Sequence, residues 1–270
     1  MDDTPLRVRF WYSNTFDKQL QEVFRAHLRD KLHDWKRAAS GHRNISPFHG
    51  LVESPGWGKV PSLVVPLYEM DINDYVHCIP QADPLLLLLK VADALAYMHS
   101  LDPPVVHGAI RGKNIHIDQH GEPMLVDLGL EHLPRAYGAS EDQHDRDHLR
   151  WLAPEIIDPP ESDVQEQDVS YYYSTPETDV WSFGMTILEV LSGKMPWANF
   201  KRNPSVVYHL IQGSLPQRPQ VEAITDLIWD LILLCVKQEP CQRINMNGVR
   251  SYLQLYVLLS HVPKHLLLPH

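Results

Sequence analysis

The sequence is poor in cysteine, in basic charge and in long apolar runs. Its three cysteines, Cys78, Cys235 and Cys241, have the spacing of neither a disulfide framework nor a zinc site, so a reducing, cytoplasmic location is expected. The formal net charge of -10 argues against nucleic-acid or membrane partners, because both bind a basic face. No apolar run follows Met1, and charged residues interrupt the later apolar stretches, so no membrane span is expected.

Histidine is frequent, with 16 residues, but no pair has the spacing of a His-Glu-x-x-His metal motif, so histidine-bound metal is not expected. The composition instead predicts a folded domain. Of the 270 residues, 44% are hydrophobic and 21% are charged, which is enough to bury a large core and is not typical of disorder.

The most informative stretch contains a predicted hairpin. Two short apolar runs, Asn114 to Ile117 and Pro123 to Val126, flank a turn in which Gly121 permits a positive φ. Polar residues lie just before and just after this hairpin. In protein kinases a catalytic loop of the pattern H-R-D-L-x-x-x-N precedes such a hairpin, and D-F-G follows it. The stretch from Val105 to Gly129 resembles this arrangement, and most closely that of the tyrosine-kinase-like branch with its fungal expansions.

The resemblance assigns a role to each position of the loop. His107 matches the motif histidine, Asn114 matches the metal-binding asparagine, and Arg111 stands where the family has Lys or Arg. Gly108 replaces the motif arginine, and Ala109 replaces the catalytic aspartate. A methyl group can neither orient a substrate hydroxyl nor accept its proton, and such a base typically contributes about 10²–10⁴-fold in rate.

Three further positions of this stretch bear on nucleotide binding. Asp127 opens Asp127-Leu128-Gly129 and matches the aspartate that holds magnesium in the family. Asn114 and Asp127 either keep a metal or nucleotide contact or only tie the loop backbone together. His116 takes the place of the leucine that forms the floor under adenine, which would make that floor polar.

The chain begins with an alternating pattern followed by a long helical one. Residues Leu6 to Trp11 alternate like a half-buried strand, and the helical pattern runs from about Phe16 to Ala38. In the family, this strand and helix carry the lysine that grips the phosphates and its acidic partner. Arg9 then replaces the lysine, and its planar head fits poorly in a pocket shaped for an ammonium group. Arg7 replaces the small alanine that roofs the adenine.

The acidic partner of that lysine and the glycine-rich loop both have no counterpart. Counting four residues back from Trp35 along the same helix face gives Lys31, which would repel Arg9. A slip of one residue offers Asp30 instead, but Asp30 lies on the face turned away from the apolar stripe. No glycine occurs before Gly41, so the lid that covers the phosphates in the family is missing.

The middle of the chain continues in family order. His42 to Ile45 resembles the H-P-N-I turn, and strands are predicted from Phe48 to Val52 and from Ser62 to Val65. The resemblance places Val65 at the gatekeeper position, where its small side chain would leave a back pocket open. A buried helix is predicted from Leu85 to Leu101.

The C-terminal half carries the most specific landmarks. Ala153-Pro154-Glu155 matches A-P-E, and Asp179 opens the signature D-V-W-S-F-G of a helix that runs to Leu191. The resemblance implies that Asp179 binds the backbone of the catalytic loop and that Arg243 pairs with Glu155. Further helices are predicted in the segments Ser205 to Gln212, Thr225 to Lys237 and Asn247 to Leu259.

An acidic segment separates these landmarks. Residues 158–178 are longer than kinases usually need and contain Tyr171-Tyr172-Tyr173. They are either a solvated surface loop or a partner-binding loop with an aromatic anchor.

The predicted fold is an α+β, bilobal, protein-kinase-like domain spanning residues 1–270. It has a partial N-lobe (1–66) with the third to fifth strands and the long helix but no glycine-rich loop, a hinge (67–70), a mainly helical C-lobe (71–260) and a tail (261–270). The combined losses favour a pseudokinase that binds a protein partner, an active kinase being one candidate, as scaffold or allosteric partner. No cofactor is expected, or ATP and magnesium if nucleotide binding is kept. The alternatives are a weakly active serine/threonine kinase and a truncated or decaying paralogue.

Overall fold

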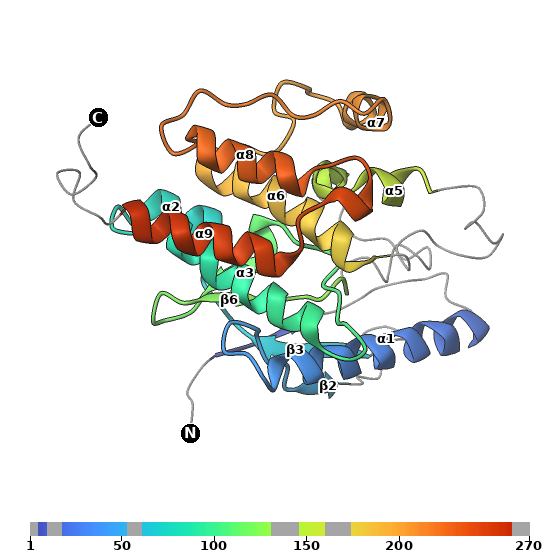
Figure 1. The fold of residues 1–270 in the computed structure, drawn as a ribbon. Coiled ribbons are helices and arrows are strands. Elements are labelled where there is room, and N and C mark those ends of the chain that lie inside the picture. The colour runs from blue at the N-terminus through green and yellow to red at the C-terminus, as the bar shows by residue number, and fades with distance from the viewer. Residues whose placement is uncertain (1–4, 10–17, 53–60, 131–145, 160–173, 261–270) are drawn as a thin grey trace, which may run out of the picture.

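The computed structural model describes residues 5–9, 18–52, 61–130, 146–159 and 174–260. These residues form two lobes: a small one of strands and one long helix, and a large one built mainly of helices (Figure 1). This is the α+β, bilobal architecture that the sequence predicts. The predicted acidic insertion falls largely on residues 160–173, and the tail on residues 261–270, so both lie mainly or wholly outside the described residues.

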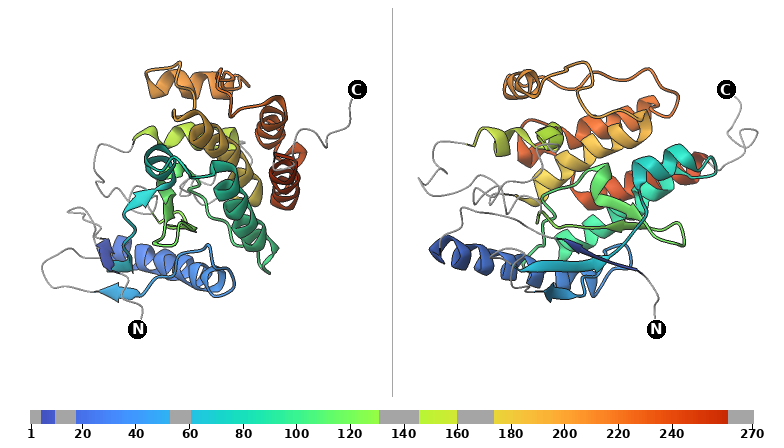
Figure 2. Two further views of the ribbon diagram at one scale, coloured as in Figure 1. Left: turned by 90° about the vertical axis from the view of Figure 1, so that its left-hand side faces the viewer. Right: turned by 180° about the vertical axis from the view of Figure 1, so that it is seen from behind.

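The small lobe consists of a three-stranded antiparallel sheet ordered β1-β3-β2 that packs on one long helix. Figure 2 shows the strands lying across this helix. The helix buries one apolar stripe at helical spacing, which includes Phe24, Leu28 and Trp35. The elements are β1 (Leu6–Arg9), α1 (Lys18–Ala39), β2 (Gly50–Val52) and β3 (Ser62–Pro66).

A short linker connects the lobes. Residues 67–69 follow β3 and lead into β4 (Met70–Asp71), so the predicted hinge ends one residue inside this strand. Strand β4 pairs with a hairpin of β5 (Ile115–Ile117) and β6 (Pro123–Leu125), and the sheet order is β4-β5-β6. The hairpin lies at the predicted place, with Gly121 at φ 77° in its turn.

A second connection joins the end of α1 to this hairpin. Asn44 donates from Nδ2 to the carbonyl of Pro123 at 2.8 Å, and the Ser46 amide donates to the carbonyl of Leu125 at 2.8 Å. His42 contacts the carboxylate of Asp93 through Nε2 at 3.2 Å. The segment that resembles H-P-N-I therefore binds the small lobe to the large one through both backbone and side chains.

Helix α6 (Pro176–Ser192) is the centre of the large lobe, because every residue from Thr178 to Leu191 is buried. It begins with a capping box between Thr175 and Thr178 and ends at Gly193, which adopts the left-handed conformation with φ 65°. Around it lie α2 (Ile72–Cys78), α3 (Pro84–Ser100), α5 (Pro154–Ile157), α7 (Asn203–Ile211), α8 (Asp226–Cys235) and α9 (Met246–Ser260).

The close packing of α6 against α8 depends on a glycine. A Cβ at Gly184 would lie 2.7 Å from the Cβ of Cys235, a distance at which the helices would have to move apart. Burial raises the pKa of the Cys235 thiol to about 12, so this cysteine is a packing residue rather than a reactive one.

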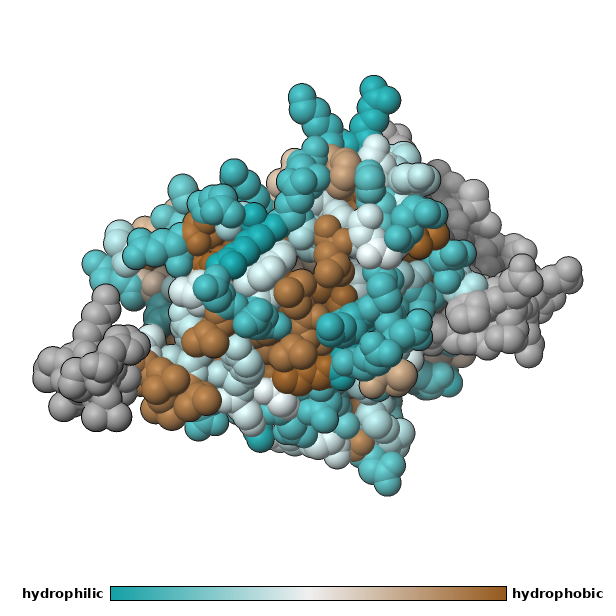
Figure 3. Space-filling view, turned by 45° about the horizontal axis from the view of Figure 1, so that its top comes forward, coloured by the Kyte–Doolittle hydropathy of each residue, from teal (hydrophilic) through white to brown (hydrophobic). Residues whose placement is uncertain are grey.

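The surface of the large lobe carries exposed apolar side chains. Within the described residues, no helix combines the length and hydropathy needed to span a membrane. Apolar side chains gather on the face that Figure 3 shows, on the side where α8 and α9 lie. The exposed leucines of these two helices are Leu227, Leu234, Leu255, Leu258 and Leu259.

Candidate functional site

The loop before the hairpin is held from below by one buried carboxylate. Asp179, near the start of α6, accepts the backbone amide of His107 on Oδ2 and that of Gly108 on Oδ1, each at 2.8 Å. His99 of α3 contacts Oδ2 through Nε2 at 2.9 Å. The carboxylate thus fixes the backbone of the loop at these two positions.

The ionised form of Asp179 is favoured by this environment. Burial alone would raise the pKa of this carboxyl group, but the hydrogen bond with His99 and the charges of His99 and His107 outweigh it, so the pKa lies below its ordinary value. The sequence predicted the contact between Asp179 and the loop backbone from the family resemblance alone, and the structure gives its physical form.

Ala109 stands in a loop whose backbone is fully ordered by hydrogen bonds. Its amide donates to Nδ1 of His107 at 3.3 Å, and its carbonyl accepts Nδ2 of Asn114 at 2.8 Å. Ala109 is buried and presents a methyl group where the family has its base. The loop is therefore formed, but position 109 supplies no group that can accept a proton.

Gly108 has a conformation that suits glycine. Its φ is 76°, and a Cβ at this position would lie 3.1 Å from Oγ of Ser174. The arginine that the family has here would therefore be strained in this loop. Arg111, in the same loop, is buried.

The segment after the hairpin also has an unusual backbone. Asp127, Leu128 and Gly129 have φ values of 87°, 31° and 70°, so three successive residues are left-handed. Asp127 is only 3% exposed. Such a run is costly for residues with a Cβ and is typical of functional segments.

Whether Asn114 and Asp127 fit magnesium can be judged from the donors present. Asn114 is tied through Nδ2 to the loop, which leaves its Oδ1 as one neutral donor beside the Asp127 carboxylate. Among the described residues, no group of three His, Cys, Asp or Glu side chains could hold a metal ion. Because magnesium in such sites is held largely by substrate phosphates, these two donors fit the ion only when a nucleotide is present.

The residues that the resemblance places at the roof, gatekeeper and floor of the adenine site lie on β1, β3 and β5. Arg7 on β1 lies directly opposite Val65 on β3 in the antiparallel register. His116 on β5 is half-buried between two buried isoleucines. Burial lowers the pKa of His116, the carboxylate of Asp71 opposes this shift, and the charge of Arg7 adds to it.

The structure places Lys31 among acidic groups. Burial lowers the pKa of the Lys31 amine, although the charges of Asp179 and Asp34 act in the opposite direction. Asp30 is exposed, as its place on the helix predicts. The side chain of Arg9 lies outside the described residues, so its repulsion with Lys31 stays a prediction.

The pair of Glu155 and Arg243 forms in bidentate geometry. Nη1 of Arg243 donates to Oε1 of Glu155 at 2.6 Å, and Nη2 donates to Oε2 at 2.8 Å. The guanidinium also donates to the carbonyls of Glu177, Lys237 and Gln238, and it stacks on the ring of Trp181 at 5.0 Å. This residue therefore joins four segments of the large lobe.

Sequence reasoning missed a second buried carboxylate beneath the loop. Glu189 of α6 accepts Nδ2 of Asn73 at 2.7 Å, the amide of Gly112 at 2.9 Å and Nε1 of Trp151 at 2.9 Å. Burial raises the pKa of Glu189 despite these hydrogen bonds. The available signal was a single acidic residue between Leu188 and Val190 in an otherwise apolar helical run.

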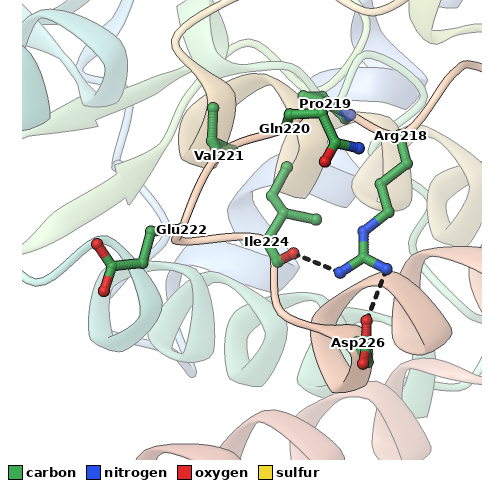
Figure 4. Close-up of a pocket in the computed structure, with 7 residues that line it drawn as sticks. All are labelled: Arg218, Pro219, Gln220, Val221, Glu222, Ile224 and Asp226. Carbon is green, nitrogen blue, oxygen red and sulfur yellow. Dashed lines mark hydrogen bonds and ion pairs between the residues drawn. The ribbon is translucent and has the colours of Figure 1, made fainter.

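The described surface also has a pocket far from the cleft. It measures about 400 Å³ and lies in the loop that leads into α8 (Figure 4). Arg218 spans it, donating to Asp226 Oδ1 at 2.7 Å and to the carbonyl of Ile224 at 2.8 Å. None of the predicted site residues lines this pocket.

Comparison with known proteins connects this geometry to a family. A sequence model described as "Protein tyrosine and serine/threonine kinase" matches residues 24–253. The match begins within α1 and ends within α9, so it includes the loop, the hairpin and α6.

Individual relatives are similar over part of their length. The probable serine/threonine-protein kinase samkB of Dictyostelium discoideum is 36% identical over 42% of this chain and 17% of that protein. Mitogen-activated protein kinase kinase kinase 5 of Arabidopsis thaliana is 27% identical over 64% of this chain and 23% of that protein. The BDNF/NT-3 growth factors receptor of Gallus gallus is 30% identical over 64% of this chain and 19% of that protein. The chain thus covers less than a quarter of each of these relatives.

Proposed function

Because the chain belongs to the family of protein tyrosine and serine/threonine kinases, we propose that it is a member that does not transfer phosphate and acts by binding another protein. The observation that carries this proposal is Ala109. The loop around it is ordered by Asp179 and Asn114, yet the position of the base holds a buried methyl group. A general base must reach the proton that it accepts, and alanine offers no acceptor.

The residues around the adenine position support the same proposal. The family resemblance places Arg7 at the roof and His116 at the floor of adenine, so both faces that would enclose a purine are charged or polar. The intact contacts of Asp179 and Arg243 keep the large lobe folded, which a binding module requires.

The role we propose is that of a scaffold or allosteric partner in cytoplasmic signalling, with an active kinase as one candidate for the partner. Exposed leucines on α8 and α9 support a partner role, because contiguous apolar surface is typical of interaction sites. The three cysteines form no disulfide, which fits a reducing compartment.

A second candidate function is that of a weakly active serine/threonine kinase. Asn114 and Asp127 favour it, because both are buried at the positions of the two metal ligands. Positioning contributes more than the base in loose phosphoryl transfer, so such an enzyme would need only bound ATP.

We expect the melting midpoint of the purified protein to be unchanged by ATP with magnesium. A ligand at about 100 times its dissociation constant would add roughly 2.7 kcal/mol and raise the midpoint by several degrees. The measurement is a thermal-unfolding scan with and without the nucleotide, after cooperative melting of the protein alone has been established. A clear shift would contradict the proposal and support the weakly active kinase, whereas the absence of a cooperative transition would indicate a decaying paralogue.

Restoring the base alone is expected to restore no activity. In the Ala109→Asp variant we expect transfer of radioactive phosphate from ATP to a generic protein substrate to stay at the level of the unchanged protein. The reason is that a base acts only on a bound nucleotide, and polar residues, Arg7 and His116, stand at the positions of the roof and floor of adenine. ATP-dependent phosphate transfer in this variant would show that the base was the only loss.

A further inference from the structure

The linker between the lobes contributes a tyrosine that reaches both Ser46 and the hairpin residue His116. Tyr68 lies two residues after β3, and its side chain is half-buried. Its hydroxyl contacts Oγ of Ser46 at 3.0 Å, and Ser46 is fully buried where the small lobe joins the hairpin. The ring therefore runs from the linker inward, and its polar end is anchored on the far side.

The ring of Tyr68 lies on the cleft side of the hairpin. Ile115 and Ile117 are buried in the core, and because side chains alternate along a strand, His116 points to the opposite face of β5. The ring centroids of Tyr68 and His116 are 5.9 Å apart with an interplanar angle of 36°. This is the distance of an aromatic pair in contact.

The same space is bounded from above by the small lobe. Val65 and Arg7 are paired across β3 and β1, and the charge of Arg7 acts on His116. A flat ring that entered between the lobes to rest on His116 would meet the ring of Tyr68 there. The two rings cannot occupy this position at the same time.

We propose that Tyr68 acts as a built-in occupant of this slot and determines that the slot takes no purine nucleoside. The inference deepens the proposed function and rests on it, because it names the residue that excludes the ligand from the cleft. A side chain of the same chain pays no translational cost for its contacts, so it displaces a free ring that makes comparable contacts. Removal of the ring leaves His116 as a stacking surface for a purine.

The test uses the Tyr68→Ala variant with adenosine as the probe. Adenosine is chosen because it carries the ring without phosphates, so the result is independent of the phosphate-binding residues. We expect isothermal titration calorimetry to show adenosine binding at least roughly tenfold tighter than in the unchanged protein. Tyr208→Ala is the matched control, because Tyr208 is 62% exposed on α7, away from the cleft, and its removal is expected to leave adenosine binding unchanged.

The Tyr68→Phe variant separates the ring from its hydrogen bond. It keeps the ring and removes only the contact with Ser46, so the slot is expected to stay closed. Tyr68→Leu also removes the ring, and it serves as a second opening variant, meaning one that empties the slot, if the alanine variant melts without cooperativity. Folded variants that bind adenosine no better than the unchanged protein would overturn the proposal, and so would equal binding by Tyr68→Phe and Tyr68→Ala. Failure of both opening variants to fold would also overturn it, because Tyr68 would then be a core residue.

These outcomes are distinct from failure of the proposed function. If the unchanged protein already binds ATP with magnesium, the non-catalytic proposal fails first. If it binds no nucleotide and the Tyr68 variants bind no adenosine, only the role of Tyr68 is wrong.

Discussion

Replacing Arg243 by alanine is expected to lower the free energy of unfolding by about 3–5 kcal/mol, the usual cost of removing one partner of a buried ion pair. The guanidinium has no exposed surface, and its loss leaves the Glu155 carboxylate and three carbonyl groups without their donor. For a domain of this size the melting midpoint should fall by about 10 °C. Urea unfolding of Arg243→Ala and of the unchanged protein measures the difference.

Two further variants test the cause. Arg243→Lys keeps the charge but cannot bond both carboxylate oxygens in parallel. Its free energy of unfolding should therefore lie between that of Arg243→Ala and that of the unchanged protein. Arg218→Ala is the matched control, because Arg218 pairs with Asp226, whose side chain is 89% exposed, and should cost under about 1 kcal/mol. Equal losses of unfolding free energy in Arg243→Ala and Arg218→Ala would show that the buried pair contributes no more to stability than the exposed one.

Replacing Asp179 by asparagine is expected to lower the free energy of unfolding by about 3 kcal/mol. An asparagine has one acceptor oxygen, so it can serve only one of the two backbone amides that Asp179 accepts, and its own amide group faces another donor. The loss should appear in urea unfolding at neutral pH. Asp226→Asn, at the exposed pair with Arg218, is the control and should change stability by less than about 0.5 kcal/mol.

The pH dependence of this effect identifies the ionised carboxylate as its source. The folded-state pKa of Asp179 lies below the ordinary value of 3.8, so its contribution is fully present above that value and is lost as the pH falls through the folded pKa. The stability difference between the unchanged protein and Asp179→Asn should therefore shrink as the pH falls below about 3.8. A difference that stays constant over this range would mean that the charge is not involved.

The landmarks of the large lobe could be predicted from the sequence because local pattern and tertiary role coincide there. The apolar run after Asp179 can only be a buried helix, and a helix at that place brings Asp179 beneath the loop. Strand alternation likewise predicts that His116 faces away from the buried isoleucines on either side of it. The end of the linker before Met70 is a small difference at an element end, where pattern is weakest. The predicted start of the long helix at Phe16 lies outside the described residues.

Other features had no signal in the sequence. Tyr68 follows a strand and precedes another, so no periodicity tells where its ring points, and only the contact with Ser46 shows it. The loss of the arginine at Gly108 was plain from the sequence, but the left-handed backbone that accompanies it was not. Glu189 is a different case. The acidic residue in an apolar helix was visible in the sequence, but its three partners were not, because they come from distant segments.

The way in which Asp179 holds the loop has a consequence for how this chain could change over evolutionary time. Its carboxylate binds the amides of His107 and Gly108, and every amino acid except proline supplies such an amide. Substitutions in the loop side chains therefore leave this tie intact. The chemistry of the loop could drift away from that of its relatives while selection for a folded lobe was still satisfied, so loss of a catalytic group and loss of the fold are separate events in this architecture.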